Sequence, residues 1–176
     1  MILKAESSVL VMVDLQARLM PVIDGGAAVL AQAVLAAKLA HLFEVPVIGT
    51  EQTPDKLGGN EAQVEQLCQR TLRKTHFNAC ADGLLDLLPV GRKDAVLVGC
   101  EAHVCVLQTA CGLLEYGYRV WLVEEAVGSR HQRDRQAALA RLRQEGVRMV
   151  SCEMLGFEWA YDSQHPAFRE LQRLIK

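Results

Sequence analysis

Three chemically reactive side chains follow short apolar runs of the sequence. Asp14 lies near the end of the run VLVMVDL, Lys74 lies in the more polar run TLRKTHF, and Cys105 comes shortly after DAVLVGC, where a helical pattern begins. A thiol needs a base to accept its proton, and both a nearby cation and the N-terminus of a helix favour the thiolate. We therefore predict nucleophilic catalysis, with Cys105 as nucleophile, Asp14 as general base and Lys74 as a neighbouring positive charge.

Each of these three residues also has a structural interpretation. An Asp at the end of a strand often caps a helix or accepts hydrogen bonds in a turn. A lone Lys is usually a solvated surface charge, and a Cys inside an apolar stretch is usually a small buried hydrophobe. What favours catalysis is the expectation that all three lie at one edge of the same sheet.

Alternating strand and helix patterns would position these residues. Nearly continuous apolar runs are typical of strands covered on both faces, and they occur at 9–15, 45–50, 94–100, 118–125 and 146–152. The polar run 71–77 predicts a strand near a sheet edge. Helical patterns fill the intervals at 27–43, 61–68, 81–88, 104–116, 131–145 and 166–175. This alternation predicts a single three-layer α/β/α domain over residues 1–176, with ligands bound beyond the carboxyl ends of its strands.

Composition excludes several classes of function. The chain has 176 residues, a net charge of -2, no basic stripe and only 5% aromatic residues, so neither nucleic acid nor an anionic membrane is an expected partner. No apolar stretch reaches the ~20 residues of a membrane span, and the first residues do not fit a signal peptide. Six cysteines without a CxxC spacing indicate a reduced, cytoplasmic protein. The first strand is not followed by GxGxxG, which argues against a nucleotide-binding oxidoreductase.

The sequence resembles the isochorismatase-like cysteine hydrolases, a family that includes nicotinamidases. The resemblance rests on VMVDLQ (11–16), TEQTPDKLGG (50–59), RKTHFNA (73–79), VGCEAHVCVLQTA (98–110) and YRVWLVEEAVGSR (118–130). The TEQ and KLG elements and the tail HPAFRELQRLIK are most similar to the subgroup called isochorismatase domain-containing proteins. The resemblance implies a six-stranded parallel sheet of order 3-2-1-4-5-6, and it carries an Asp–Lys–Cys triad over to Asp14, Lys74 and Cys105.

The same resemblance implies how the substrate would be held. It implies a cis peptide bond between Cys100 and Glu101, which would turn the Glu101 N–H toward the Cys105 N–H to form an oxyanion hole. The alternative for this segment is an ordinary strand-to-helix turn. The candidate pocket residues are Gln16, Glu51, Gln52, Phe77 and His103. A core position for Phe77 and an exposed loop for Glu51 and Gln52 are the alternatives.

A departure from the family pattern bears on metal binding. Nicotinamidases of this family bind a metal through an Asp-x-His pair, where this chain has Gln52 and Pro54. Proline offers no ligand atom and an amide is a poor transition-metal ligand, so we expect no metal and no other cofactor. We interpret His76 and His103 as polar residues of the pocket. We also find no cluster of arginines that would bind the two carboxylates of isochorismate.

These observations predict a hydrolase that attacks a small amide-like or isochorismate-like substrate through a covalent Cys105 intermediate. The alternative is a non-catalytic binding or scaffold protein on the same fold. The apolar helical patterns at 27–43 and 104–116 predict a homo-oligomer, in which residues 106–116 and 126–135 would meet a partner.

Overall fold

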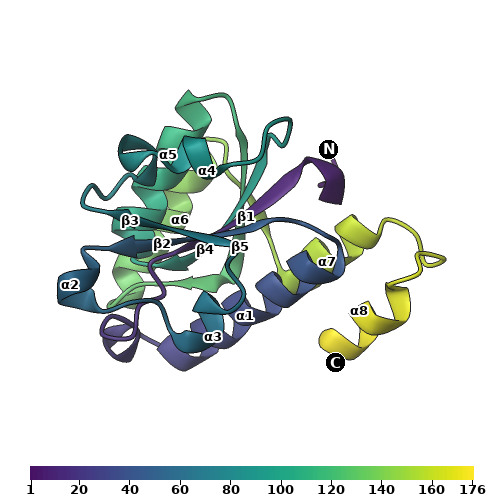
Figure 1. Ribbon diagram of the computed structural model, residues 1–176, viewed down its shortest axis with the longest axis horizontal. Helices are drawn as coiled ribbons and strands as arrows, with labels where there is room; N and C mark the ends of the chain where they lie inside the picture. The colour runs from purple at the N-terminus through teal and green to yellow at the C-terminus, as the bar shows by residue number, and fades with distance from the viewer.

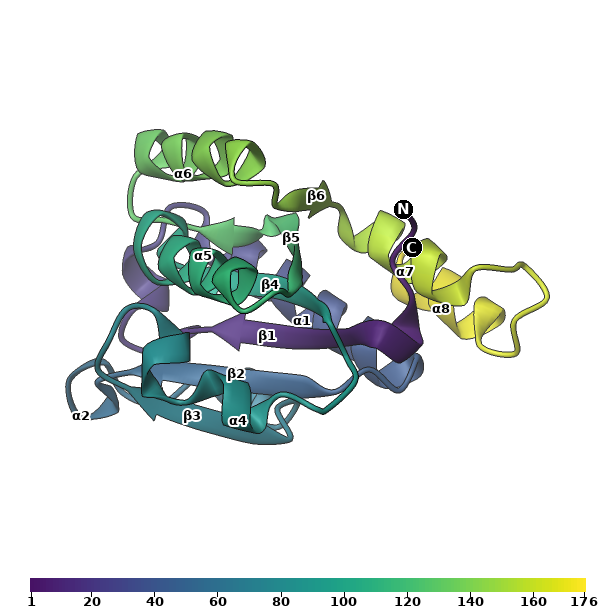
Figure 2. The same ribbon diagram turned by 90° about the horizontal axis from the view of Figure 1, so that it is seen from above.

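A computed structural model describes all 176 residues and contains one six-stranded parallel sheet with helices on both faces, as Figure 1 and Figure 2 show. The strands are β1 (Ser8–Val13), β2 (Val47–Gln52), β3 (Arg70–Lys74), β4 (Asp94–Cys100), β5 (Arg119–Gly128) and β6 (Arg148–Val150). Their order in the sheet is β3-β2-β1-β4-β5-β6, and every pairing is parallel. The predicted three-layer architecture and strand order are confirmed.

Helices of different length connect the strands. The α-helices are α1 (Gly26–Leu42), α2 (Pro54–Leu57), α3 (Ala62–Glu65), α4 (Leu84–Leu87), α5 (Leu107–Glu115), α6 (Gln132–Gln144), α7 (Cys152–Ala160) and α8 (Phe168–Leu174). Short 3-10 turns occupy Ala5–Ser7, Met20–Val22 and Ala79–Asp82, and a π-helical turn occupies Ala102–Val106. No helix is both long enough and apolar enough to cross a membrane.

Alternate residues of the buried strands face opposite helical layers. Along β1, Leu10 and Met12 join the core formed with α1, α7 and α8. Val9 and Val11 join the second core, formed with α4, α5 and α6. Successive strand side chains point to opposite faces, so a continuous apolar run fills both cores at once.

The start of α5 and the whole of α7 differ from the sequence prediction. The helical pattern predicted at 104–116 begins as the π-helical turn before α5 starts at Leu107. Helix α7 was not predicted, because its sequence CEMLGFEWA has a central glycine and no clear polar face. The Ser151 hydroxyl caps this helix by accepting a hydrogen bond from the Met154 N–H at 3.1 Å.

Strand register brings the candidate residues to one edge of the sheet. Val13 of β1 is aligned with Gly99 of β4, so Asp14 follows β1 where β4 also ends. A Cβ at Gly99 would collide with the Val13 carbonyl oxygen, and Gly99 has a φ of +136°. Only glycine permits this close approach of the two strands beside the reactive residues.

Candidate active site

Asp14 is held by two buried hydrogen bonds at the end of β1. Its Oδ2 accepts from the Lys74 ammonium at 2.8 Å, and its Oδ1 accepts from the Thr50 hydroxyl at 2.7 Å. The Asp14 and Lys74 side chains are both fully buried. A buried ion pair is tolerated only where its remaining polar atoms are satisfied. Thr50 was not singled out from the sequence, although it is the β2 residue paired with Val13.

Lys74 has acceptors for all of its ammonium hydrogens within the protein. Besides Asp14, its Nζ donates to Gln52 Oε1 at 2.7 Å and to the His76 carbonyl oxygen at 3.4 Å. The ammonium therefore supplies a fixed positive charge beside Asp14 and Cys105 rather than a free binding group for substrate.

Cys105 lies in the π-helical turn with 5% of its surface exposed, and its Sγ is 3.9 Å from Gln52 Oε1. Burial and then the negative charge of Asp14 raise the pKa of this thiol to about 12, whereas the positive charge of Lys74 acts in the opposite direction. The resting side chain is therefore a neutral thiol at physiological pH. The direction of this pKa shift opposes the stabilised thiolate that we expected from the helix start and the lysine, because burial and Asp14 outweigh Lys74.

Glu101 departs from the geometry that the resemblance implied. No peptide bond in the chain is cis, so the expected cis bond between Cys100 and Glu101 is wrong. Glu101 instead turns the chain through a left-handed conformation with a φ of 53°. The Glu101 backbone partly offsets the burial that raises the pKa of the Cys100 thiol. The contribution of the Glu101 N–H to an oxyanion hole beside Cys105 stays a prediction.

The Glu101 side chain ties the end of β4 to the segment after β5. Its Oε1 accepts from Arg130 Nε at 2.5 Å, and its Oε2 lies 3.3 Å from His103 Nδ1. His103 Nδ1 also lies 3.0 Å from the Ser129 hydroxyl. The Glu101 carbonyl oxygen accepts from the N–H groups of Val104 and Val106, which starts the turn that carries Cys105.

Asp14 and Cys105 open into a cavity of about 390 Å³. Of the five candidate pocket residues, Gln52 and Phe77 line this cavity, whereas Gln16, Glu51 and His103 do not. Gln16 is buried and forms hydrogen bonds with both backbone polar groups of Gln52. Its Oε1 accepts from the Gln52 N–H, and its Nε2 donates to the Gln52 carbonyl oxygen. The Glu51 carboxylate accepts from the backbone N–H of Asn60.

Further lining residues come from the segments that follow β1, β2, β4 and β5, and of these residues only Glu101 was expected at the site. They are Arg18, Leu19, Val22, Leu57, Glu101, Val104 and Arg130. Arg18 follows β1 and Arg130 follows β5, so both lie at the edge where parallel strands end. The same edge rule that grouped Asp14, Lys74 and Cys105 would have grouped these arginines.

Comparison with known proteins identifies the family of this chain. Residues 8–154 match the family model described as the isochorismatase domain. The chain belongs to the isochorismatase family. It is 38% identical over 172 residues to isochorismatase domain-containing protein 2 of Homo sapiens, a match that covers 97% of this chain and 83% of the relative. Isochorismatase domain-containing protein 2A of Mus musculus is 36% identical over 172 residues, 97% of this chain and 84% of the relative.

Solved structures extend the comparison to the whole isochorismatase fold. A structure of the MAR1 ribonuclease of Caenorhabditis elegans has a TM-score of 0.94 and is 32% identical, covering 99% of this chain and 92% of the other. The agreement therefore includes the C-terminal segment beyond residue 154, where the family model stops.

The metal site of the family's nicotinamidases has no counterpart in the residues of this isochorismatase-family chain. At the matching position, Gln52 Oε1 accepts from Lys74 and Gln52 Nε2 donates to the Thr75 carbonyl oxygen at 2.7 Å, so the amide is fully engaged. His76 pairs with Asp82 at 2.6 Å, while His103 pairs with Glu101 and Ser129. No three His, Cys, Asp or Glu side chains gather as a metal site would require.

Proposed function

We propose that this protein is a cysteine hydrolase that cleaves a small amide-like substrate through a covalent intermediate on Cys105. The observation that carries the proposal is that the Cys105 thiol and the Asp14 carboxylate line one cavity while Lys74 lies directly beside both. A nucleophile, a base and a fixed cation within one small cavity are the groups that acyl transfer needs.

A neutral resting thiol determines the order of events. Asp14 accepts the Cys105 proton as the sulfur attacks the substrate carbonyl carbon, so the thiolate forms only during attack. The carbonyl oxygen becomes an oxyanion, for which we assign the Cys105 backbone N–H as donor. When the C–N bond breaks, Asp14 returns its proton to the leaving amine, and a thioester remains on Cys105. Asp14 then deprotonates a water molecule that attacks this thioester, which releases the acid and restores the thiol.

Lys74 supports both charge states of Asp14 in this cycle. Its 2.8 Å contact stabilises the carboxylate before proton transfer. Its additional contacts with Gln52 and His76 keep the ammonium in place when Asp14 is transiently neutral. The positive charge that then faces the sulfur lowers the energy of the developing thiolate.

The cavity favours a small and largely apolar acyl group. About 390 Å³ is near the lower end of small-molecule sites, and its walls include Leu19, Val22, Leu57, Phe77 and Val104. The worm relative is named a ribonuclease, but a cavity of this size on a chain of net charge -2 fits a small molecule better than an RNA strand. If the wild type cleaves RNA but turns over no amide, and Cys105→Ala loses the RNA cleavage, the ribonuclease activity would be favoured instead.

Acrylamide is a direct probe of the proposed nucleophile, because it is a small amide that alkylates thiolates. A structure of the same fold from Pseudomonas aeruginosa contains covalent acrylamide. We expect intact-mass analysis to show one acrylamide per chain, mapped by peptide analysis to Cys105. The Cys105→Ala variant is the matched control and should gain no adduct at limiting dose. A screen of amides, ureides and vinyl ethers should then find turnover that Cys105→Ala lacks.

The outcome of this screen also tests the alternative. Absence of turnover on every compound, with Cys105 unlabelled, would favour a non-catalytic binding or scaffold protein.

We also propose that the protein is a homo-oligomer. A structural relative from Escherichia coli, 23% identical, is described as an octameric hydrolase. Exposed apolar side chains, among them Val22, Phe77 and Tyr116, are available for contact with another copy. Light scattering at micromolar concentration tests this proposal, and a mass near 19.4 kDa would contradict it.

A further inference from the structure

The charged residues that line the proposed active-site cavity do not balance. Asp14 has a buried ammonium partner at 2.8 Å, and Glu101 is paired with Arg130 through its Oε1. Arg18 is the remaining charged residue of the lining, and its only side-chain hydrogen bond is to a backbone carbonyl oxygen. The cavity therefore carries one positive charge that no carboxylate of the protein compensates.

Backbone and side-chain contacts hold Arg18 against α2 and the glycine that follows it. The Arg18 N–H donates to the Leu57 carbonyl oxygen at 3.2 Å, and its Nη1 donates to the Lys56 carbonyl oxygen at 3.0 Å. The aliphatic part of Arg18 packs against Gly58, where a Cβ would lie 3.6 Å from Arg18 Cγ. The guanidinium is therefore positioned at the cavity before a ligand binds, which lowers the entropic cost of binding.

The Nε–Nη2 edge of the Arg18 guanidinium has no hydrogen-bond partner in the protein. The same edge of Arg119 shows what such a group binds, because Arg119 Nε and Nη2 donate to the two carboxylate oxygens of Asp94 at 2.7 and 2.6 Å. A planar guanidinium edge matches a carboxylate in this bidentate way, and these hydrogen bonds are stronger than those between neutral groups. Arg18 thus offers a carboxylate site that the protein itself does not fill.

The reactive groups of the cavity lie inside it, whereas this charge lies at its mouth. Asp14 is fully buried and Cys105 is 5% exposed, but Arg18 is exposed. Apolar side chains, among them Leu19 and Leu57, contribute to the remaining wall. A molecule with an amide at the sulfur and a carboxylate at the guanidinium would place a short hydrocarbon chain along this wall.

We propose that the substrate is an amide that also carries one carboxylate, and that Arg18 is the residue that selects it. This inference rests on the proposed function, because it names the substrate class of the same site. The carboxylate binds the free edge of Arg18, and Cys105 attacks the amide carbonyl carbon at the other end. One arginine fits one carboxylate, which favours the monoamide of a short dicarboxylic acid. Its hydrolysis consumes one water molecule and releases ammonia and the dicarboxylic acid.

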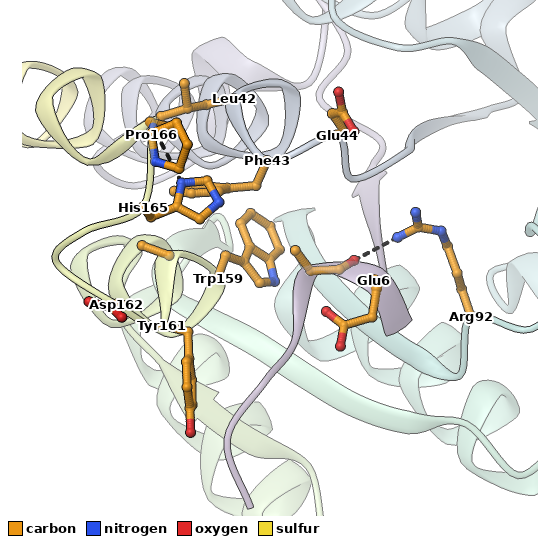
Figure 3. A pocket seen from close by; sticks show the side chains of 13 residues that line it. Glu6, Leu42, Phe43, Glu44, Arg92, Trp159, Tyr161, Asp162, His165 and Pro166 are labelled. Atoms are coloured by element: carbon orange, nitrogen blue, oxygen red, sulfur yellow. Dashed lines mark hydrogen bonds between the residues drawn. The ribbon is translucent and has the colours of Figure 1, made fainter.

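A larger cavity, of about 740 Å³, lies at the amino ends of the strands and is unsuited to such a substrate. Glu6, Glu44 and Asp162 contribute three carboxylates to its lining, and Arg92 contributes the guanidinium that Figure 3 shows opposite them. Two backbone carbonyl oxygens already accept hydrogen bonds from Arg92 Nη1, at 2.6 and 2.8 Å. The excess of carboxylates would repel an anion. We therefore assign the anionic amide to the Cys105 cavity.

Three amides of similar length test the substrate class. Succinamate carries a carboxylate, 3-nitropropanamide carries an isosteric neutral nitro group, and β-alaninamide carries an ammonium group at the same place. Isothermal titration calorimetry with Cys105→Ala measures their binding without turnover. We expect succinamate to bind at least about fivefold more tightly than 3-nitropropanamide, and β-alaninamide to bind most weakly. Equal affinities for the first two compounds, or no saturable binding of succinamate at millimolar concentrations, would overturn the proposal.

Variants of Arg18 in the Cys105→Ala background assign the preference to this residue. Arg18→Gln should bring the affinities for succinamate and 3-nitropropanamide to about the same value. Arg18→Lys should keep part of the preference, because lysine keeps the charge but lacks the planar fork. The matched control is Arg133→Gln, which removes an exposed arginine at the start of α6 that does not line the cavity, and it should leave the preference unchanged.

A purely structural role of Arg18 would weaken the binding of both amides together, so a preference that survives in Arg18→Gln would refute its selecting role. An equal loss of preference in Arg133→Gln would reduce the effect to net charge and would also refute it. Thermal unfolding of each variant checks that the fold is kept.

Turnover by the wild type separates the failure of this proposal from the failure of the hydrolase. Hydrolysis of succinamate with a higher kcat/KM than that of 3-nitropropanamide would support both. Faster hydrolysis of 3-nitropropanamide would overturn the anionic substrate class and leave the cysteine mechanism intact. A succinamate preference in Cys105→Ala, without turnover of any amide by the wild type, would contradict the hydrolase and keep Arg18 as a carboxylate-binding residue.

Discussion

Replacing Asp14 by Asn should separate the reactivity of Cys105 from its catalytic use. The negative charge of Asp14 is the largest cause after burial of the raised Cys105 pKa, and Lys74 opposes it. In Asp14→Asn, the opposing negative charge is gone and the Lys74 charge faces the sulfur without compensation. The side chain can keep its contacts, because the amide oxygen can accept from Lys74 and the Thr50 hydroxyl can accept from the amide. We therefore expect the pKa of the Cys105 thiol to fall.

The expected change in labelling rate follows from that fall. With a pKa of about 12, only about one Cys105 in ten thousand is ionised at pH 8. Lowering the pKa by one unit raises the thiolate population about tenfold, but it also weakens each thiolate as a nucleophile by about threefold. Alkylation of Cys105 should therefore accelerate about threefold for each unit. Turnover should fall by about 10²–10⁴-fold in the same variant, because the general base is lost.

Peptide-level mass spectrometry after timed iodoacetamide treatment at pH 8 measures the alkylation rate of Cys105 alone. Asp86→Asn is the control, because it makes the same substitution at an exposed site remote from the cavity. Circular dichroism shows whether Asp14→Asn is folded, because this variant leaves the buried Lys74 ammonium without its carboxylate partner. Slower alkylation in a folded Asp14→Asn protein would refute the expected fall of the Cys105 pKa.

Three further outcomes are expected. Gly99→Ala should lower the free energy of unfolding by about 3 kcal/mol or more in urea titration, because the new Cβ meets the Val13 carbonyl. The control Gly91→Ala, at an open position, should cost only about 1 kcal/mol. Equal losses in the two variants would contradict the close approach of Gly99 to Val13. The raised pKa of Cys105 favours the thiol in the folded state. The contribution of the buried thiol to stability is therefore complete below pH 9 and declines toward pH 12. A free energy of unfolding that rises over this range in the wild type, relative to Cys105→Ala, would contradict that sign. Elemental analysis should find no stoichiometric transition metal, and one metal per chain would return attention to the histidines.

The sheet was predictable because its central strands are buried on both faces. Runs such as DAVLVGC are apolar at nearly every position, and in a chain of alternating strand and helix this pattern is typical of a strand inside a parallel sheet. The strand order, in contrast, came from the family resemblance, since nothing in composition orders parallel strands. Helix α7 was missed because a glycine and scattered apolar residues obscure its period.

The meeting of Asp14, Lys74 and Cys105 followed from one rule about the ends of parallel strands. Their electrostatics did not follow from it, because the Cys105 pKa depends on burial and on the balance of two opposite charges. The conformation of Glu101 was equally inaccessible from sequence. Its left-handed turn accompanies contacts with Arg130 and His103, one of them 29 residues away along the chain.

A rapid-quench experiment tests the central claim most directly. An amide that the protein hydrolyses is mixed with excess enzyme, and the reaction is stopped in acid. The mass of the peptide that contains Cys105 is then measured by mass spectrometry. We predict that this peptide gains the mass of the acyl group while the amine is released, and that Cys105→Ala gives neither product. Release of the amine with an unmodified Cys105 peptide, or turnover that persists in Cys105→Ala, would contradict a covalent mechanism at this residue.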